Sequence, residues 1–137
     1  MKFEGGCYCG QLRYAAEGEP MMKGQCYCRE CQYITGGAPH TYMLMRPEGF
    51  RYTRGEPRQF SRDDLESPVT REFCATCGTH ITTRRPGLRA VILKVGTLDD
   101  PSVFEAPQMA IFTVDKQPFH QIPDGIRTYE RLPPPRQ

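Results

Sequence analysis

Seven cysteines, arranged in three short groups, are the residues of this chain best suited to chemistry. Thiolates spaced two or three residues apart can bind one metal ion, and zinc is commonly held in this way. The odd number of cysteines and their close spacing favour metal binding over disulfides. The groups are Cys7-Tyr8-Cys9-Gly10, Cys26-Tyr27-Cys28-Arg29-Glu30-Cys31 and Cys74-Ala75-Thr76-Cys77-Gly78.

The first and third groups share a glycine directly after their second cysteine, Gly10 and Gly78. Glycine allows the left-handed turn that brings two thiolates to one ion and points backbone amides at sulfur. Together the two groups supply four thiolates, which is the closed ligand set of a structural zinc site. The predicted structural site consists of Cys7, Cys9, Cys74 and Cys77.

Two alternatives to this structural site remain open at the level of the sequence. In one, the four thiols form disulfides or stay free and buried. In the other, the Cys28/Cys31 pair joins the Cys74/Cys77 pair in a ribbon-like site. The second alternative ranks lower, because it leaves three cysteines without a metal: Cys7, Cys9 and Cys26.

The second group has three cysteines and no fourth cysteine left to complete it. A catalytic zinc usually keeps three protein ligands and leaves its fourth position to water or substrate. The count therefore predicts a catalytic zinc at Cys26, Cys28 and Cys31. The alternative is a closed site completed by a histidine, for which His40 and His80 are the candidates.

The ligand type restricts what such an open site can do. Zinc with three thiolates carries a net charge of −1, which makes it a poor source of hydroxide but a suitable holder of a further soft ligand. A substrate thiol bound there loses its proton near neutral pH and can attack a small electrophile such as an aldehyde. The residues therefore indicate formation or cleavage of a carbon–sulfur bond.

The elements that position these cysteines are expected to be short strands. The chain has 137 residues, 38% of them hydrophobic, with 13 glycines and 13 prolines, a composition that favours one mainly β domain over a helical bundle. Arg29–Ile34, stopped by Gly36-Gly37, is the one helix expected. The predicted strands are Gln11–Ala15, Met21–Cys26, His40–Arg46, Phe50–Thr53, Arg58–Ser61, Val69–Phe73, His80–Thr83, Arg89–Val95 and Met109–Thr113.

Charge and hydropathy limit the partners. A formal net charge of +2, spread along the chain, argues against binding to nucleic acid. The longest apolar run, Ala90–Leu93, is far too short to cross a membrane, and the first residues lack the apolar stretch of a secretory signal. We therefore expect a cytoplasmic protein, in which thiols stay reduced. From Pro118 onward we expect an ordered strap that frays at Pro133-Pro134-Pro135.

The three ordered cysteine groups, with Thr35-Gly36 after the second, resemble the glutathione-dependent formaldehyde-activating enzyme family, also called the centromere-protein-V/GFA domain. Val95–Pro101 and Ile111–Phe119 are similar to later segments of that family. The resemblance covers residues 3 to 132, so the whole chain, residues 1–137, is expected to form a single centromere-protein-V/GFA domain with a frayed C-terminal tail.

The resemblance implies an Mss4-like fold, which is mainly β, with small antiparallel sheets organised around zinc and at most one or two short helices. It assigns the first and third cysteine groups to a structural zinc and Cys26, Cys28 and Cys31 to a catalytic zinc. The activity it implies is that of a carbon–sulfur lyase, the condensation of glutathione with formaldehyde to S-hydroxymethylglutathione. The residue after Cys31, often basic in the family, is Gln32 here. Candidate ligands for the carboxylates of glutathione are Arg29, Arg46 and Arg51.

The main functional hypothesis is therefore a zinc-dependent carbon–sulfur lyase that adds a thiol such as glutathione to formaldehyde or another small aldehyde, or catalyses the reverse. Its cofactors would be one structural and one catalytic zinc, and its partners a small-molecule thiol and an aldehyde. Two other functions compete with it. One is a non-catalytic, zinc-stabilised module that binds a protein or nucleic acid. The other is a redox or metal-trafficking role in which Cys28 and Cys31 oxidise reversibly.

Overall fold

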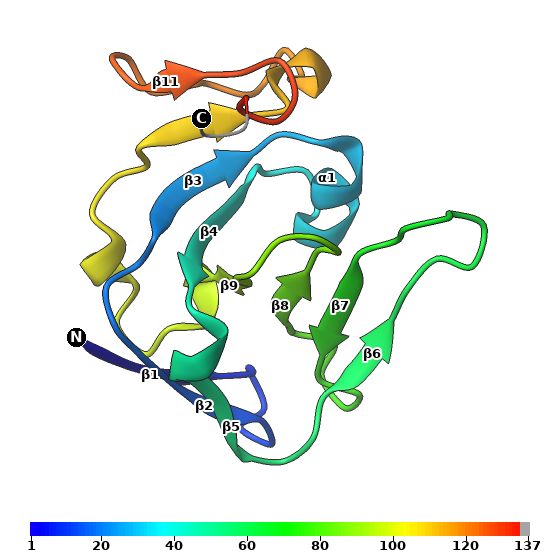
Figure 1. Cartoon of the computed structure of the whole chain (residues 1–137), viewed down its shortest axis with the longest axis vertical. Helices are drawn as coiled ribbons and strands as arrows, with labels where there is room; N and C mark the ends of the chain where they lie inside the picture. Colours follow the sequence, from blue (N-terminus) through cyan, green and yellow to red (C-terminus); the bar gives the residue numbers. More distant parts are fainter. Residues whose placement is uncertain (135–137) are drawn as a thin grey trace.

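A computed structural model of the protein describes residues 1–134 and contains, within them, eleven short strands and one α-helix, α1 (Arg29–Thr35) (Figure 1). Four single-turn 3₁₀ helices join them: η1 (Pro47–Gly49), η2 (Val95–Thr97), η3 (Pro101–Phe104) and η4 (Thr113–Asp115). The strands are β1 (Lys2–Gly6), β2 (Arg13–Glu17), β3 (Met22–Cys26), β4 (His40–Met45), β5 (Phe50–Arg54), β6 (Arg58–Phe60), β7 (Thr70–Phe73), β8 (His80–Arg84), β9 (Val91–Lys94), β10 (Met109–Ile111) and β11 (Arg127–Thr128).

The strands form two sheets. An antiparallel sheet has the order β1-β2-β5, and a larger sheet has the order β11-β10-β3-β4-β9-β8-β7-β6. Figure 1 shows the small sheet below the larger one, which curves from β11 at the top to β6 at the right. The mainly β fold with one short α-helix is confirmed. The prediction of antiparallel sheets fails at one strand, because β10 pairs in parallel with both β3 and β11.

The nine strands predicted from alternation and turn residues correspond to β2 through β10, and the predicted helix corresponds to α1. The strands β1 and β11 were missed. In β1 two of the five residues are glycines, which lower strand propensity and hide the alternating burial of Phe3 and Gly5. In β11 only two residues pair, so no periodicity is available to detect.

The strand β4 separates two hydrophobic cores and is buried on both faces. Met43 and Met45 point into the core shared with the small sheet, whereas Tyr42 points into a second core that includes Cys26 and Cys31. Because side chains alternate along a strand, β4 links the packing of the small sheet to the surroundings of these two cysteines. The second group of cysteines therefore lies at the end of an apolar core.

The C-terminal segment packs along β10, which agrees with the ordered strap expected from Pro118 onward. The backbone N–H of Tyr129 donates to the Ala110 carbonyl (2.9 Å), and β11 pairs with β10 in parallel. His120 and the Gly37 carbonyl lie 2.6 Å apart across the loop that follows α1. Of the residues predicted to fray, Pro135 lies outside the described residues. Within residues 1–134, no helix has both the length and the apolar character needed to span a membrane.

Gly5 is expected to be essential for the packing of β1. A Cβ atom at this position would overlap the Thr97 carbonyl oxygen and the Tyr14 ring, whereas a Cβ at Gly96 would meet no atom within 4 Å. Substitution Gly5→Ala should therefore lower the free energy of unfolding by about 1–3 kcal/mol, the usual cost of overpacking. Gly96→Ala is the matched control and should stay within about 0.5 kcal/mol of the original chain. Urea unfolding of both variants checks this, and equal midpoints would contradict it.

Candidate metal centres

The four-cysteine cluster is built by two tight turns that lie far apart in the sequence. Cys7 and Cys9 follow β1, and Cys74 and Cys77 lie in the turn between β7 and β8. One Sγ atom from each residue lies within 4.8 Å of all the others. The glycines that follow, Gly10 and Gly78, have φ angles of 83° and 79°, so both turns adopt the left-handed conformation predicted from the sequence.

The sulfur positions of this cluster fit a tetrahedral zinc. Four Zn–S bonds of about 2.3 Å place neighbouring sulfurs about 3.8 Å apart. The Sγ atom of Cys9 lies 3.6 Å from that of Cys7 and 3.7 Å from that of Cys74. The four residues can therefore close around one ion without rearrangement of the turns.

Donors around the cluster lower the pKa of Cys7 and Cys77 and so favour their thiolate forms, which bind zinc. The N–H of Leu12 donates to the Cys7 sulfur (3.2 Å), and the N–H of Thr76 donates to the Cys74 sulfur (3.4 Å). Donation by the Thr79 hydroxyl and backbone N–H lowers the pKa of Cys77 to about 5. These donors are the amides that the two glycine turns were expected to direct at sulfur.

The alternative pairings of these cysteines do not occur. Cys74 and Cys77 lie with Cys7 and Cys9 and not with Cys28 and Cys31, so the ribbon-like site is wrong. All seven cysteines are free, so the disulfide form of the other alternative is wrong. The turn after β1 and the turn after β7 meet because β1 and β2 fold against the larger sheet, a contact that spacing within either group could not reveal.

The three-cysteine cluster, Cys26, Cys28 and Cys31, gathers at the start of α1. Cys26 ends β3, Cys28 caps the N-terminus of α1, and Cys31 lies in its first turn. The three Sγ atoms lie within 4.8 Å of one another. The Cys28 and Cys31 sulfurs are 2.9 Å apart, which exceeds the ~2.05 Å of a disulfide and is below the ~3.8 Å spacing on zinc.

Cys28 is the N-cap residue of α1, and this position favours its thiolate form. Its sulfur accepts a hydrogen bond from the Cys31 backbone N–H (3.3 Å), replacing the oxygen that serine or aspartate would supply there. Interactions with the Cys26 and Cys31 side chains, together with this N–H, lower the pKa of Cys28 far below its usual range. Cys28 is partly exposed, whereas Cys26 and Cys31 are buried.

Neither candidate histidine joins the three-cysteine cluster. The Nδ1 atom of His40 lies 4.0 Å from the Cys31 sulfur, while its Nε2 lies 3.2 Å from the ammonium of Lys94. The Nδ1 atom of His80 is buried without a hydrogen-bond partner, and its ring stacks on Phe73. Within the described part of the chain, the grouped metal ligands at this end of α1 are therefore three cysteines and no histidine.

A family model described as glutathione-dependent formaldehyde-activating enzyme (GFA) matches residues 2–115 of the chain, well over half of its length. This chain belongs to the GFA family. A solved structure of a protein from Rhodobacter sphaeroides is similar in fold, with a TM-score of 0.61 and 19% identity, over 76% of this chain and 96% of that one. No curated protein matches the chain.

In this GFA chain Gln32, the residue after Cys31, has a structural role. Its side chain is buried, and its amide nitrogen donates to the carbonyls of Tyr27 and Asp115, at 2.9 Å each. The bond to Asp115 holds α1 against the 3₁₀ helix η4, which contains that residue. A lysine here would bury an uncompensated charge, so glutamine suits this packing.

The three arginines considered as carboxylate ligands are dispersed over the GFA fold. Arg29 is exposed at the start of α1, donates to Gln32 and lies over the Tyr33 ring at 5.1 Å. Arg46 is exposed between β4 and η1, and Arg51 is exposed on β5 in the small sheet. Of the three, only Arg29 follows directly on a cysteine of the second cluster.

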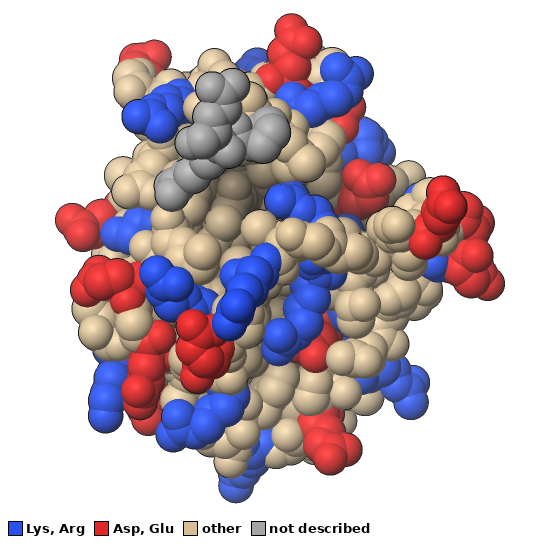
Figure 2. Space-filling model, in the orientation of Figure 1, with Lys and Arg blue, Asp and Glu red and all other residues tan. Residues whose placement is uncertain are grey.

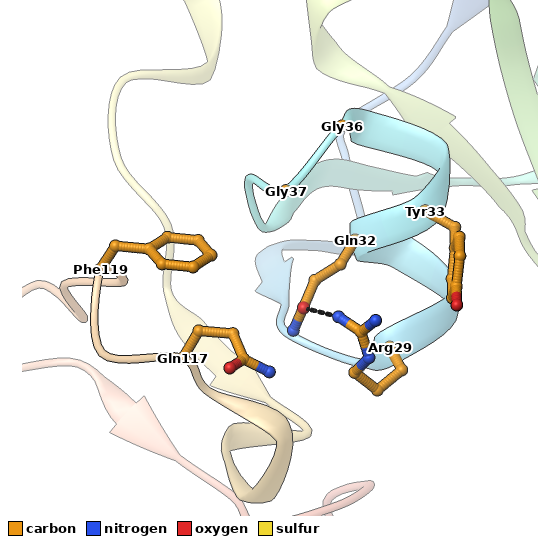
Figure 3. A pocket seen from close by; sticks show the side chains of 7 residues that line it. All are labelled: Arg29, Gln32, Tyr33, Gly36, Gly37, Gln117 and Phe119. Carbon is orange, nitrogen blue, oxygen red and sulfur yellow. Dashed lines mark hydrogen bonds between the residues drawn. The ribbon is translucent and has the colours of Figure 1, made fainter.

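Two adjoining clefts, of about 380 and 440 Å³, lie between the end of α1 and the segment 117–121. Figure 3 shows Phe119 and Gln117 facing α1 across the first of them. No cysteine is among the described residues that line either cleft. The first is lined by Arg29, Gln32, Tyr33, Gly36, Gly37, Gln117 and Phe119.

Sequence reasoning missed one charged residue beside the second cluster, Lys94. Its ammonium is 3.2 Å from His40 Nε2 and 3.2 Å from Thr83 Oγ1, and its side chain is buried. Burial lowers the pKa of Lys94 to about 8. The one available signal was a lysine at the end of the apolar run Val91–Lys94, where a strand does not favour this residue.

Proposed function

We propose that this GFA chain is a zinc-dependent carbon–sulfur lyase that adds a thiol such as glutathione to formaldehyde or another small aldehyde, or catalyses the reverse reaction. The observation that carries the proposal is the composition of the second cluster. Its grouped ligands are three cysteines, with Cys28 partly exposed, and a separate four-cysteine cluster has the ligand number of a structural site. Three protein ligands are the pattern of a catalytic site, and four that of a structural one. A cytoplasmic location, where the thiols stay reduced, belongs to the same proposal.

The residues Cys26, Cys28 and Cys31 would hold the catalytic zinc. When bound, zinc supplies a Lewis acid that lowers the pKa of a thiol placed beside it. In the proposed reaction the thiol sulfur forms a bond to the aldehyde carbon while the carbonyl π bond breaks. The proton lost by the thiol ends on the new hydroxyl group, so the reaction needs no oxidant or reductant.

The chain itself keeps the three sulfurs in position. The N-terminus of α1 directs the Cys31 N–H at the Cys28 sulfur, and the buried His40 ring lies against Cys31. The bonds of Gln32 to Tyr27 and Asp115 hold α1 in place. Cys26 and Cys31 are buried and Cys28 is partly exposed, so an incoming thiol would approach from the side of Cys28.

Zinc content and its response to thiol test this function. After expression with added zinc and purification without chelators, we expect two zinc ions per chain, and excess glutathione should alter the retention of one of them. The same preparation should form S-hydroxymethylglutathione from glutathione and formaldehyde faster than the uncatalysed reaction does, as measured by nuclear magnetic resonance. A single zinc per chain that does not respond to glutathione, together with a rate equal to the uncatalysed one, would contradict the proposal and favour a zinc-stabilised binding module.

A further inference from the structure

Cationic side chains line one face of the larger sheet beside the three-cysteine cluster. The strand register aligns Arg71 of β7 with Thr83 of β8, and the Thr83 hydroxyl contacts the Lys94 ammonium of β9. Cross-strand partners lie on the same face of a sheet, so Arg71, Thr83 and Lys94 share one face. Lys94 in turn contacts His40, which contacts Cys31, so this face continues to the cluster. Figure 2 shows Lys and Arg side chains on the surface of the molecule in front of β8 and β9.

The two cations of this face lack a carboxylate partner. Both hydrogen-bond partners of Lys94 are neutral groups, although its side chain is buried. Among residues 1–134, no salt bridge includes Lys94 or Arg71. A buried ammonium without a counter-ion is costly, which is a reason to look for an anion supplied from outside the chain.

The neighbouring carboxylate, Glu72, does not fill this role. It follows Arg71 in β7, so its side chain points to the opposite face of the sheet. There it accepts hydrogen bonds from Tyr52 (3.0 Å) and Thr82 (2.6 Å), and it forms a salt bridge with Arg84. The carboxylate oxygens of Glu72 are therefore engaged on the face opposite to Arg71, and Glu72 does not pair with Arg71.

His80 supplies a second, independent feature of the same region. Its Nδ1 atom is buried and has no hydrogen-bond partner. Burial, followed by the positive charges of Lys94 and Arg71, lowers the pKa of His80, which keeps the imidazole neutral at pH 7. A neutral imidazole has one N–H to donate, so an anion near Lys94 and Arg71 would also give the His80 ring a partner.

We propose that Lys94, Arg71 and His80 bind a carboxylate group of the substrate that reacts at Cys26, Cys28 and Cys31. This inference rests on the proposed function. With zinc bound, the three thiolates would carry a net charge of −1 against the +2 of Lys94 and Arg71 together. The sum is +1, the charge that one carboxylate cancels. Arg71 and Cys28 are both partly exposed, while Lys94 and Thr83 are buried beneath them. A ligand can therefore contact the arginine and the cluster from solvent.

The carboxylate can come from the thiol or from the aldehyde, and paired substrates distinguish the two. The thiol pair is 3-mercaptopropionate against 2-mercaptoethanol, and the aldehyde pair is glyoxylate against formaldehyde. In the variant Arg71→Met, KM should rise about tenfold or more for the charged member of one pair and stay unchanged for its neutral member. Arg71→Lys, which keeps the charge, should recover part of the loss. The pair that responds identifies the source of the carboxylate.

A binding measurement separates this inference from the proposed function. S-Methylglutathione keeps the carboxylates of glutathione but has no thiol, so calorimetry with it reports binding without turnover, and glyoxylate is titrated in the same way. Weaker binding of either probe to Arg71→Met, with binding to the control Arg127→Met unchanged, would support the site even if no lyase activity is found. Arg127 is exposed on β11, far along the sheet from β7. Turnover and binding that do not distinguish Arg71→Met from the original chain for any of these compounds would overturn the inference.

Discussion

Replacing Cys74 with serine is expected to leave the chain largely unfolded at room temperature. Cys74 is 2% exposed, and its sulfur lies 3.7 Å from that of Cys9, a residue 65 positions earlier in the sequence. Structural zinc contributes about 10–16 kcal/mol of apparent binding free energy, which is similar to the whole stability of a typical domain, about 5–15 kcal/mol. Loss of one buried ligand removes much of that contribution and leaves a polar hydroxyl in an apolar site.

Circular dichroism and thermal unfolding in the presence of zinc measure this effect. The original chain should unfold cooperatively and lose its transition when a strong chelator removes zinc, whereas Cys74→Ser should lack the transition from the start. Cys28→Ser is the matched control, since it makes the same atomic change in the other cluster. A Cys74→Ser variant that melts at the temperature of the original chain and holds as much zinc would show that the four-cysteine cluster is not a structural site.

The second large effect is expected at Cys28, where serine should abolish activity without unfolding the chain. Cys28 is the N-cap of α1, and serine is among the best N-cap residues, so the helix should persist. A hydroxyl is a much poorer zinc ligand than a thiolate at neutral pH, so the second site should lose its ion. Formation of S-hydroxymethylglutathione should fall by at least about 10³-fold, the scale seen when an essential group of a site is removed.

Zinc content and unfolding temperature, measured on the same sample, complete this prediction. Cys28→Ser should keep one zinc per chain and an unfolding temperature within a few degrees of the original. The two serine variants should therefore differ: Cys74→Ser should lose its folded structure, whereas Cys28→Ser should stay folded and lose its activity. Turnover by Cys28→Ser at the rate of the original chain would remove the catalytic assignment of the second cluster.

Local patterns predicted most elements of the fold and the division of the cysteines. Strands β2 to β10 and helix α1 were found from alternation and turn residues, and Gly10 and Gly78 indicated which cysteine pairs form tight turns. These features depend on residues within a few positions of one another, so the sequence contains them directly. The strand β1, with two glycines, and the two-residue β11 lack such a pattern and were missed.

Contacts between distant strands decided the surroundings of the second cluster. The sequence offered His40 and His80 equally as a fourth ligand, but the pairing of β3 with β4 sets His40 beside Cys26, and Lys94 then contacts its ring. Nothing near Lys94 in the sequence indicates this contact. It arises because β4 and β9, which lie far apart in the sequence, pair as neighbouring strands. The cation Arg71 reaches the same face through β7 and β8.

The sequence by itself determined which cysteines lie together in short local turns, because short spacing and adjacent glycines dictate local conformation. Only the tertiary structure decided that Cys7 meets Cys77 and that Lys94 contacts His40, the ring that lies beside Cys31. The physical reason is that strand order and register arise from burial of apolar side chains over the whole chain. That burial brings together residues whose positions in the sequence carry no record of their contact.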